Sequence, residues 1–175
     1  MTNQVIASAK TLFSAYREAL TGLEAGLGSD FSKTVALMKA STGHVVVCGM
    51  GKSGIIGRKI SATLASTGTP SLFLHPAEAI HGDLGMVRRG DIVLLISYSG
   101  STEEIVRLLP AFKRLDARLI AMTGNPSSII ATSAEISLDI SVDREACPLN
   151  LAPTTSSLNS LVLGDAVAVA LMEAR

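Results

Sequence analysis

Tryptophan is absent from this sequence, and aromatic residues make up only 3% of it. Proteins that bind single-stranded nucleic acid stack the bases on aromatic side chains, so the composition argues against such a platform. Neither sign of charge is in excess, because Lys and Arg together number 15 and Asp and Glu also number 15. The chain therefore has no net field that would attract nucleic acid or an anionic membrane.

Cysteine is also scarce, with Cys48 inside an apolar run and Cys147 alone in a predicted loop. Two such residues are typical of reduced thiols in a cytosolic protein and not of a disulfide framework. No apolar run approaches the length of about 18 residues that spans a membrane. The sequence also does not begin with a basic region followed by an apolar one. We therefore expect a soluble, cytoplasmic protein.

The length of 175 residues and the mass of 18.1 kDa favour one domain, 1–175, with a substantial core. We expect N-terminal helices at 1–42 and an α/β core at 43–175. In the first helix, apolar residues recur every three or four positions from Val5 to Leu27. This stripe could cover a sheet or contact a second copy of the chain, and we favour the contact between copies.

From Val45 onward the sequence alternates between apolar strands and helices, which predicts right-handed crossovers and a parallel sheet. Ligands of such sheets bind at the carboxyl ends of the strands. The predicted strands are 45–48, 71–74, 92–96, 119–122 and 136–140. The predicted helices of this part are 53–66, 77–81, 102–114 and 154–174, and Pro110 is expected to kink the third of them.

A turn rich in hydroxyl groups lies between the predicted strand 92–96 and the predicted helix 102–114. The first N–H groups of a helix lack partners and carry partial positive charge, so hydroxyls and a glycine there form a cradle for a phosphate group. A simple helix cap is the alternative interpretation. We favour the anion site, because the turn offers four Ser and Thr hydroxyls where a cap requires one. The predicted ligands are Ser97, Ser99, the Gly100 N–H and Thr102.

A glycine-rich turn, Gly49–Gly54, follows the first predicted strand of the core. Its spacing matches G-x-G-x-x-G, but the second strand ends at His75 without the acid that would hold a ribose. A Walker A loop would require a glycine at Val46, which lies within the strand. Neither nucleotide site fits. The turn instead places Lys52 where it can neutralise a phosphate or a developing oxyanion, and an exposed lysine at a helix start is the alternative.

Two adjacent glutamates begin the helix after the hydroxyl-rich turn, and helix geometry turns them to different sides. Glu103 precedes Arg107 by four residues, which predicts a surface ion pair. Glu104 precedes Leu108 by four residues, on the stripe predicted to face the sheet. A carboxylate turned inward near a phosphate loop is typical of a general base.

Further titratable residues follow the second and fifth strands, again at the carboxyl edge. His75 and His81 could ligate a metal, but their spacing of six is not one face of a helix, so a structural role fits equally. Glu145 could act as a second acid or base, or be a solvated loop carboxylate. The Thr and Ser residues at 154–157 could form a second ligand loop or cap the last helix.

Taken together, these residues resemble the sugar isomerase (SIS) domain, and in particular the arabinose 5-phosphate isomerase family. The resemblance runs from about Val45 to the end of the sequence. Its most specific motifs are His81–Met86 (His-Gly-Asp-Leu-Gly-Met) and Glu145–Leu149 (Glu-Ala-Cys-Pro-Leu), whereas Ser97–Gly100 matches the whole superfamily. The other matching segments are Gly49–Gly54, Ser66–Pro70, His75–Ala79 and Leu151–Thr154.

The resemblance implies a three-layer sandwich with a five-stranded parallel sheet, similar to flavodoxin and Rossmann folds, that assembles as a homotetramer. It implies an aldose–ketose isomerase that interconverts D-arabinose 5-phosphate and D-ribulose 5-phosphate. This step supplies Kdo for lipopolysaccharide or capsule. The catalytic lysine and glutamates of the family fall on Lys52, Glu104 and Glu145, and its substrate-contacting histidines fall on His75 and His81. No cofactor is required, although zinc on His75 would inhibit.

We accordingly expect isomerisation through a cis-enediol. The turn at 97–102, helped by Ser53, holds the phosphate, and one of the two glutamates moves the proton between C2 and C1. Lys52 and His81 stabilise the enediolate oxygens or open the sugar ring.

The sequence departs from the family pattern in two places. Family members continue with a His-Pro-Gly segment and paired CBS domains, whereas this sequence ends at Arg175, so it is either cut or a single-domain member in which His81 and the glutamates supply the acid and base. Tyr98 stands where Asn is frequent and is expected to alter the phosphate pocket slightly. Two alternatives stay open: another SIS sugar-phosphate isomerase, or a non-catalytic sugar-phosphate-binding regulatory domain.

Overall fold

Five runs of β-branched residues and leucine form a single parallel sheet in the computed structural model, which describes residues 2–175. The strands are β1 (Val45–Gly49), β2 (Ser71–Leu74), β3 (Ile92–Ile96), β4 (Arg118–Thr123) and β5 (Ile136–Asp139). Every neighbouring pair is parallel, in the order β2-β1-β3-β4-β5. The predicted α/β fold is confirmed, and all five predicted strands lie within a residue or two of their expected bounds.

The strand order has a consequence for ligand binding. From β1 the chain moves outward to β2 and then returns to place β3 on the other side of β1, so the winding direction reverses between β1 and β3. A crevice opens at such a switch point, outside the carboxyl ends of the two strands. The segments that follow β1 and β3 are the two glycine-containing turns singled out from the sequence.

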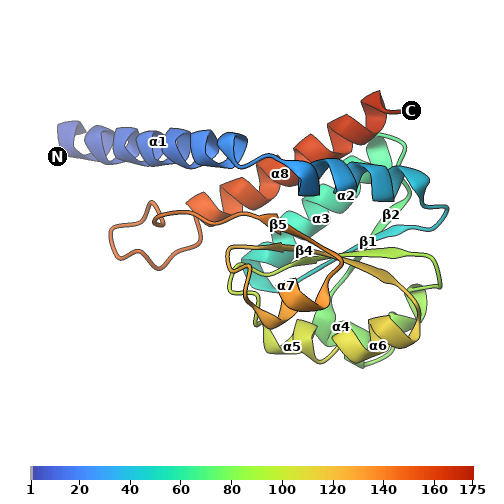
Figure 1. The fold of residues 1–175 in the computed structure, drawn as a ribbon. Helices are drawn as coiled ribbons and strands as arrows, with labels where there is room; N and C mark the ends of the chain where they lie inside the picture. Colours follow the sequence, from blue (N-terminus) through green and yellow to red (C-terminus); the bar gives the residue numbers. More distant parts are fainter. Residues whose placement is uncertain (1) are drawn as a thin grey trace.

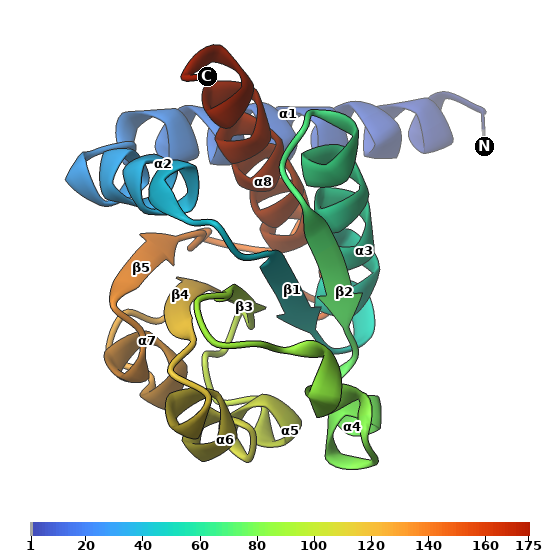
Figure 2. The same ribbon diagram turned by 90° about the vertical axis from the view of Figure 1, so that its right-hand side faces the viewer.

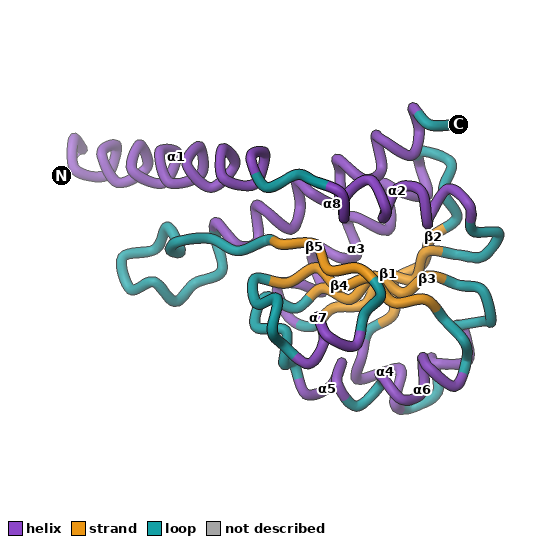
Figure 3. Tube along the Cα trace, in the orientation of Figure 1, coloured by secondary structure: helices purple, strands orange, loops and turns teal. Residues whose placement is uncertain are grey.

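Both faces of the sheet are covered by helices, because successive side chains of each strand point to opposite faces. Val47, Leu94 and Ile120 belong to one buried cluster, and Val46, Val93 and Ala121 belong to the other. Figures 1 and 3 show the sheet as the middle of three layers. One layer holds α2 (Ser29–Ala40), α3 (Gly51–Ser66) and α8 (Thr155–Glu173), and the other holds α4 (Pro76–Ile80), α5 (Glu103–Val106), α6 (Leu109–Arg114) and α7 (Ile129–Ser133).

The helix predicted over 102–114 is divided into two short helices, α5 and α6, so the kink expected at Pro110 is a complete break. Pro110 has no N–H to donate to the carbonyl of Val106, so the α-helical ladder cannot continue through this point. Leu108 instead donates to Ile105 at 3.0 Å, as in a tight turn. Two elements were not predicted: α7 and the short 3₁₀ helix η1 (Asp83–Met86).

The first helix, α1 (Thr2–Ala25), projects away from the sandwich and contacts α8 through its C-terminal part (Figures 1 and 2). The predicted apolar stripe is exposed at its N-terminal end, where Val5 is 70% exposed, and half-buried from Leu12 to Leu23. Leu23, on the stripe, packs against the core cluster between the sheet and the layer of α3 and α8. Only the C-terminal part of the stripe therefore contacts the sandwich within this chain.

One helix, α8, is long and apolar enough to cross a membrane by length and composition. Half of this apolar stretch is buried inside the fold, where α8 packs along α3 and contributes Leu163 and Val167 to the core. The core helix of a soluble protein has the same composition and burial.

Candidate functional site

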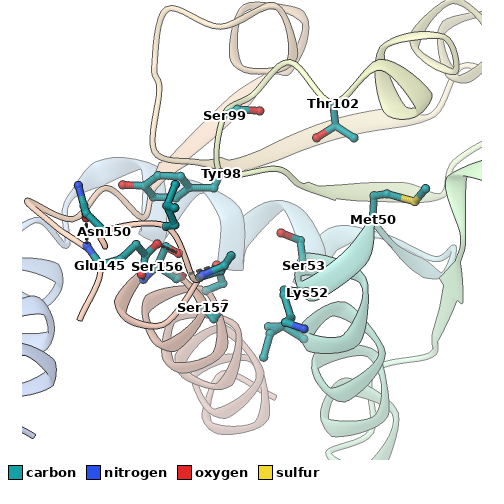
Figure 4. Close-up of a pocket in the computed structure, with 14 residues that line it drawn as sticks. Met50, Lys52, Ser53, Tyr98, Ser99, Thr102, Glu145, Asn150, Ser156 and Ser157 are labelled. Atoms are coloured by element: carbon teal, nitrogen blue, oxygen red, sulfur yellow. Dashed lines mark hydrogen bonds between the residues drawn. The ribbon is translucent and has the colours of Figure 1, made fainter. Parts of the chain in front are cut away.

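A cleft of about 450 Å³ opens at the carboxyl edge of the sheet, where β1 and β3 end (Figure 4). Four segments form its walls: the first turns of α3, the turn after β3, the loop that leads from β5 into α8, and the first turns of α8. Its lining residues are Met50, Lys52, Ser53, Ile56, Tyr98, Ser99, Thr102, Glu145, Asn150, Leu151, Pro153, Ser156, Ser157 and Ser160.

The glycines of the Gly49–Gly54 turn bring α3 close to β1. A Cβ on Gly54 would lie 2.7 Å from the Gly49 carbonyl oxygen, so only glycine permits this approach. Gly51 has φ +57°, a conformation that side chains disfavour. This explains the glycine pattern without a nucleotide. No side chain caps the N-terminus of α3 and no acid lies in its first turn, so its N–H groups and positive dipole end are open to an anion.

Lys52 and Ser53 stand on this first turn of α3 and both line the cleft. In Figure 4 the Ser53 hydroxyl points across the cleft toward the segment that carries Ser99 and Thr102. Lys52 is exposed and forms no ion pair among the described residues. Its charge is therefore available to an anionic ligand.

The turn after β3 divides its predicted ligands into two groups. The buried Ser97 hydroxyl bonds to Thr102 Oγ1 at 2.7 Å and accepts the Gly100 N–H at 3.1 Å. Gly100 has φ +66°, and a Cβ there would lie 1.9 Å from Ser128 Oγ. Ser97 and Gly100 thus hold the shape of the turn, and Gly100 would have to exchange partners to bind a phosphate. Ser99 and Thr102 line the cleft itself.

Glu145 reaches the cleft from the loop after β5, and its carboxylate caps the N-terminus of α8. Oε2 accepts the Thr154 N–H at 2.7 Å, Thr154 Oγ1 at 2.9 Å and the Ser156 N–H at 3.4 Å. Thr155 Oγ1 lies 3.1 Å from Oε2, but its one hydrogen goes to the nearer Arg144 carbonyl at 2.6 Å. Oε1 accepts only the Ser156 hydroxyl among the described residues. The two oxygens of a carboxylate offer about four lone-pair positions, so Oε2 is saturated and Oε1 keeps capacity for a substrate. The Thr and Ser cluster at 154–157 acts as the hydrogen-bonding partner of this cap.

The charge state of Glu145 follows from two opposing causes. Burial by itself raises the pKa of this carboxyl, but the hydrogen bonds from Ser156 and Thr154 together outweigh burial and hold the pKa below its ordinary value. Glu145 is therefore a carboxylate at neutral pH, in the form that can accept a proton.

Besides Ser97 and Gly100, three further predicted site residues do not line the cleft: His75, His81 and Glu104. His75 precedes α4, His81 follows it, and Glu104 lies in the first turn of α5, which packs against α4. The ring of His75 lies 6.4 Å from the ring of Phe73, which packs against the core cluster on the α3 side of the sheet. The Glu103–Arg107 ion pair predicted beside Glu104 is confirmed.

The resemblance implies that zinc could bind at His75, which requires suitable ligands around this residue. The Nδ1 atom of His75 is buried and has no hydrogen-bond partner among the described residues, so one nitrogen could serve as a ligand. However, residues 2–175 contain no group of three or more His, Cys, Asp or Glu side chains that could hold a metal ion. The side chains of one chain thus do not form a zinc site.

Several residues of the cleft were assigned no definite role from the sequence. Asn150 has φ +52°, and its Oδ1 accepts the Glu145 N–H at 2.6 Å, so it fixes the loop around the carboxylate. Ser156 and Ser157 enter from α8. The Ser and Thr cluster was a visible signal for α8, whereas nothing in the sequence marks the backbone conformation of Asn150.

Comparison with known proteins supports the family resemblance seen in the sequence. A family model described as the SIS domain matches residues 37–170. Arabinose 5-phosphate isomerase KdsD of Pseudomonas aeruginosa is 60% identical over 170 residues, which are 97% of this chain and 52% of that protein. Arabinose 5-phosphate isomerase GutQ of Escherichia coli K12 is 51% identical over 169 residues, which are 97% of this chain and 52% of that protein.

Among solved structures, an Escherichia coli CFT073 protein in complex with arabinose 5-phosphate superposes with a TM-score of 0.93 at 44% sequence identity. The match covers 99% of this chain and 93% of that one. The resemblance to SIS domains and arabinose 5-phosphate isomerases is confirmed. The chain spans about half the length of the curated relatives that it matches.

Proposed function

Because the chain belongs to the SIS domain family, we propose that it is an isomerase that interconverts D-arabinose 5-phosphate and D-ribulose 5-phosphate. The observation that carries the proposal is the likeness to the Escherichia coli CFT073 protein in complex with arabinose 5-phosphate. The names of the relatives from Pseudomonas aeruginosa and Escherichia coli K12 point to the same reaction.

The phosphate group is proposed to bind at the α3 side of the cleft. Ser53, Ser99 and Thr102 supply hydroxyl donors, and the uncapped start of α3 supplies backbone N–H groups and a positive dipole end. Lys52 adds a full positive charge that can also stabilise an enediolate oxygen. This arrangement leaves the other end of the sugar directed along the cleft toward Glu145.

The proton transfer is proposed to use Glu145. Glu145 lines the cleft as a carboxylate with one unsaturated oxygen, whereas Glu104 lies outside it. Glu145 would take the proton from C2 of arabinose 5-phosphate and return it to C1, while the proton of the C2 hydroxyl moves to the C1 oxygen. Lys52 and His81 stay the candidates for ring opening, and Glu104 stays the alternative base. The reaction redistributes protons within one substrate, so we propose that it requires no cofactor and that zinc at His75 inhibits.

The cellular role and assembly are proposals as well. An arabinose 5-phosphate isomerase of the cytoplasm would supply Kdo for lipopolysaccharide or capsule. We propose that the exposed apolar residues of α1, Val5, Ile6 and Phe13, contact further copies in a homotetramer. Sedimentation of the Phe13→Glu variant tests this: a smaller species is expected, and an unchanged sedimentation coefficient argues against the contact.

Turnover of a panel of sugar phosphates, followed by NMR, tests the proposed function. We expect conversion of arabinose 5-phosphate and much slower conversion of hexose and heptose phosphates. Rapid turnover of another sugar phosphate instead would identify a different isomerase of the same family. Binding of arabinose 5-phosphate without turnover would indicate a regulatory sugar-phosphate sensor.

A further inference from the structure

Tyr98 connects two walls of the cleft. Its backbone is part of the turn at 97–102, called the phosphate turn below, and its side chain bonds to the loop that carries Glu145. Its carbonyl oxygen accepts the Gly124 N–H at 3.0 Å and Thr123 Oγ1 at 3.2 Å, which tie the turn to the end of β4. Its hydroxyl donates to the Val142 carbonyl oxygen and accepts the Val142 N–H, both at 3.3 Å. A phenol hydroxyl can fill both roles at once.

The Tyr98 ring packs against the residue that follows β4. It lies against the end of β4, where a Cβ on Gly124 would come within 2.6 Å of its Cε2 atom. In Figure 4 the ring lies between the segment that carries Ser99 and the loop that carries Glu145 and Asn150. The absence of a side chain at position 124 thus makes room for the ring.

The hydroxyl of Tyr98 bonds to the segment 141–145, which ends at Glu145. Val142 lies three residues before Glu145, and the same segment is held to α8 by Thr155 Oγ1, which donates to the Arg144 carbonyl at 2.6 Å. Asn159 Nδ2 donates to the Ser141 carbonyl at 3.3 Å. The segment is therefore fixed from the α8 side by these bonds and from the phosphate turn by Tyr98.

We infer that Tyr98 is a positioning residue that sets the span between the phosphate turn and the Glu145 carboxylate. The inference rests on the proposed function, in which the turn holds one end of the sugar and Glu145 moves a proton at the other. A misplacement of reacting groups by about 1 Å can lower a rate by about 10²-fold, so a fixed span between the two matters for kcat. The role differs from that of a phosphate ligand, which would act on binding.

The Tyr98→Phe variant separates these roles, because it keeps the ring against Gly124 and removes only the two hydroxyl contacts. We expect kcat for arabinose 5-phosphate to fall roughly 10-fold, while KM and the inhibition constant of inorganic phosphate change less than about twofold. A weaker phosphate inhibition with unchanged kcat would overturn the inference and make Tyr98 part of the phosphate site. Unchanged kcat and KM would overturn it as well.

Tyr16→Phe is the matched control, because the chain has two tyrosines and Tyr16 lies on α1 away from the cleft. We expect this variant to keep the wild-type kcat. Hydrogen exchange of the peptide that covers 141–146 gives a readout that does not depend on turnover: it should be faster in Tyr98→Phe than in Tyr16→Phe, and equal rates would contradict the link. A wild-type chain without isomerase activity would refute the proposed function, whereas normal wild-type turnover with an unaffected Tyr98→Phe variant would refute only the positioning role.

Discussion

Glu145 and Thr154 are joined by two hydrogen bonds, one from the Thr154 N–H at 2.7 Å and one from Thr154 Oγ1 at 2.9 Å, both to Oε2 of the carboxylate. Thr154 immediately precedes the 19-residue helix α8, so the negative charge lies at the positive end of a long helix dipole. The candidate base is thus also the cap of a core helix. Catalytic and stability effects of Glu145 should therefore be measured together.

Replacement of Glu145 by Gln should affect both properties. We expect kcat to fall by about 10²–10⁴-fold, because the amide cannot accept the proton. We also expect the free energy of unfolding to fall by about 1 kcal/mol, because the charge at the helix start is lost. Steady-state kinetics and urea unfolding measure the two effects. Asp143→Asn is the control, since Asp143 is an exposed carboxylate of the same loop outside the cleft lining, and it should change neither.

The pH dependence of stability follows from the lowered pKa of Glu145. A carboxyl whose pKa is lower in the folded than in the unfolded state stabilises the fold above its unfolded pKa, near 4.5, and this contribution is lost as the pH falls through the folded value. The difference in Tm between wild type and Glu145→Gln should be constant from pH 7 to about 5 and shrink below pH 4.5. A difference that grows on acidification would contradict the lowered pKa.

Gly100 should tolerate substitution poorly. Gly100→Ala combines a φ of +66° with a collision of Cβ against Ser128 Oγ, so we expect a loss of about 3 kcal/mol or more in the free energy of unfolding. Gly90→Ala isolates the backbone effect, because Gly90 has φ +88° and open space around its Cβ position. This control should lose only about 1–2 kcal/mol. Equal losses in denaturant unfolding would show that Ser128 moves aside freely.

The two cysteines should differ in reactivity. Burial raises the pKa of the Cys48 thiol to about 12, and its side chain is inaccessible. The Cys147 thiol accepts the N–H groups of Ala152 and Leu151 at 3.1 Å, and these lower its pKa. A thiol reagent at pH 7.5 should therefore label one cysteine in the native chain and two in denaturant. The Cys147→Ser variant should lose the native labelling, and persistent labelling would place Cys48 within reach of solvent.

Much of the fold could be predicted because the strands are short, apolar and bounded by glycine or polar residues. Pro110 predicted the disruption between α5 and α6, but not that it would be a full break, since Leu108 and Phe112 are buried as a continuous helix would predict. Helix α7 was missed because it spans only Ile129–Ser133 and follows Asn125–Ser128, a segment typical of a loop. Its cap, Ser128 Oγ accepting the Ala131 N–H at 3.3 Å, becomes visible only in the structure.

Some cleft residues could be predicted from their residue type and their position after a strand of the α/β pattern. Lys52, Ser53, Ser99 and Thr102 follow strands at the carboxyl edge, and all of them line the cleft. Glu104 was predicted to turn inward because it precedes Leu108 by four residues; it is half-buried, but the cleft lies elsewhere. The contacts of Tyr98 with Val142 join residues 44 positions apart, which no local pattern encodes.

The central claim is tested most directly by ¹H NMR of the wild-type chain with D-arabinose 5-phosphate in D₂O. We predict that D-ribulose 5-phosphate forms and that solvent deuterium enters the transferred position of product or recovered substrate, because a carboxylate exchanges its proton with solvent during the enediol step. Glu145→Gln should slow the appearance of both signals by about 10²–10⁴-fold. An unchanged arabinose 5-phosphate spectrum after prolonged incubation with folded wild-type protein would contradict the account.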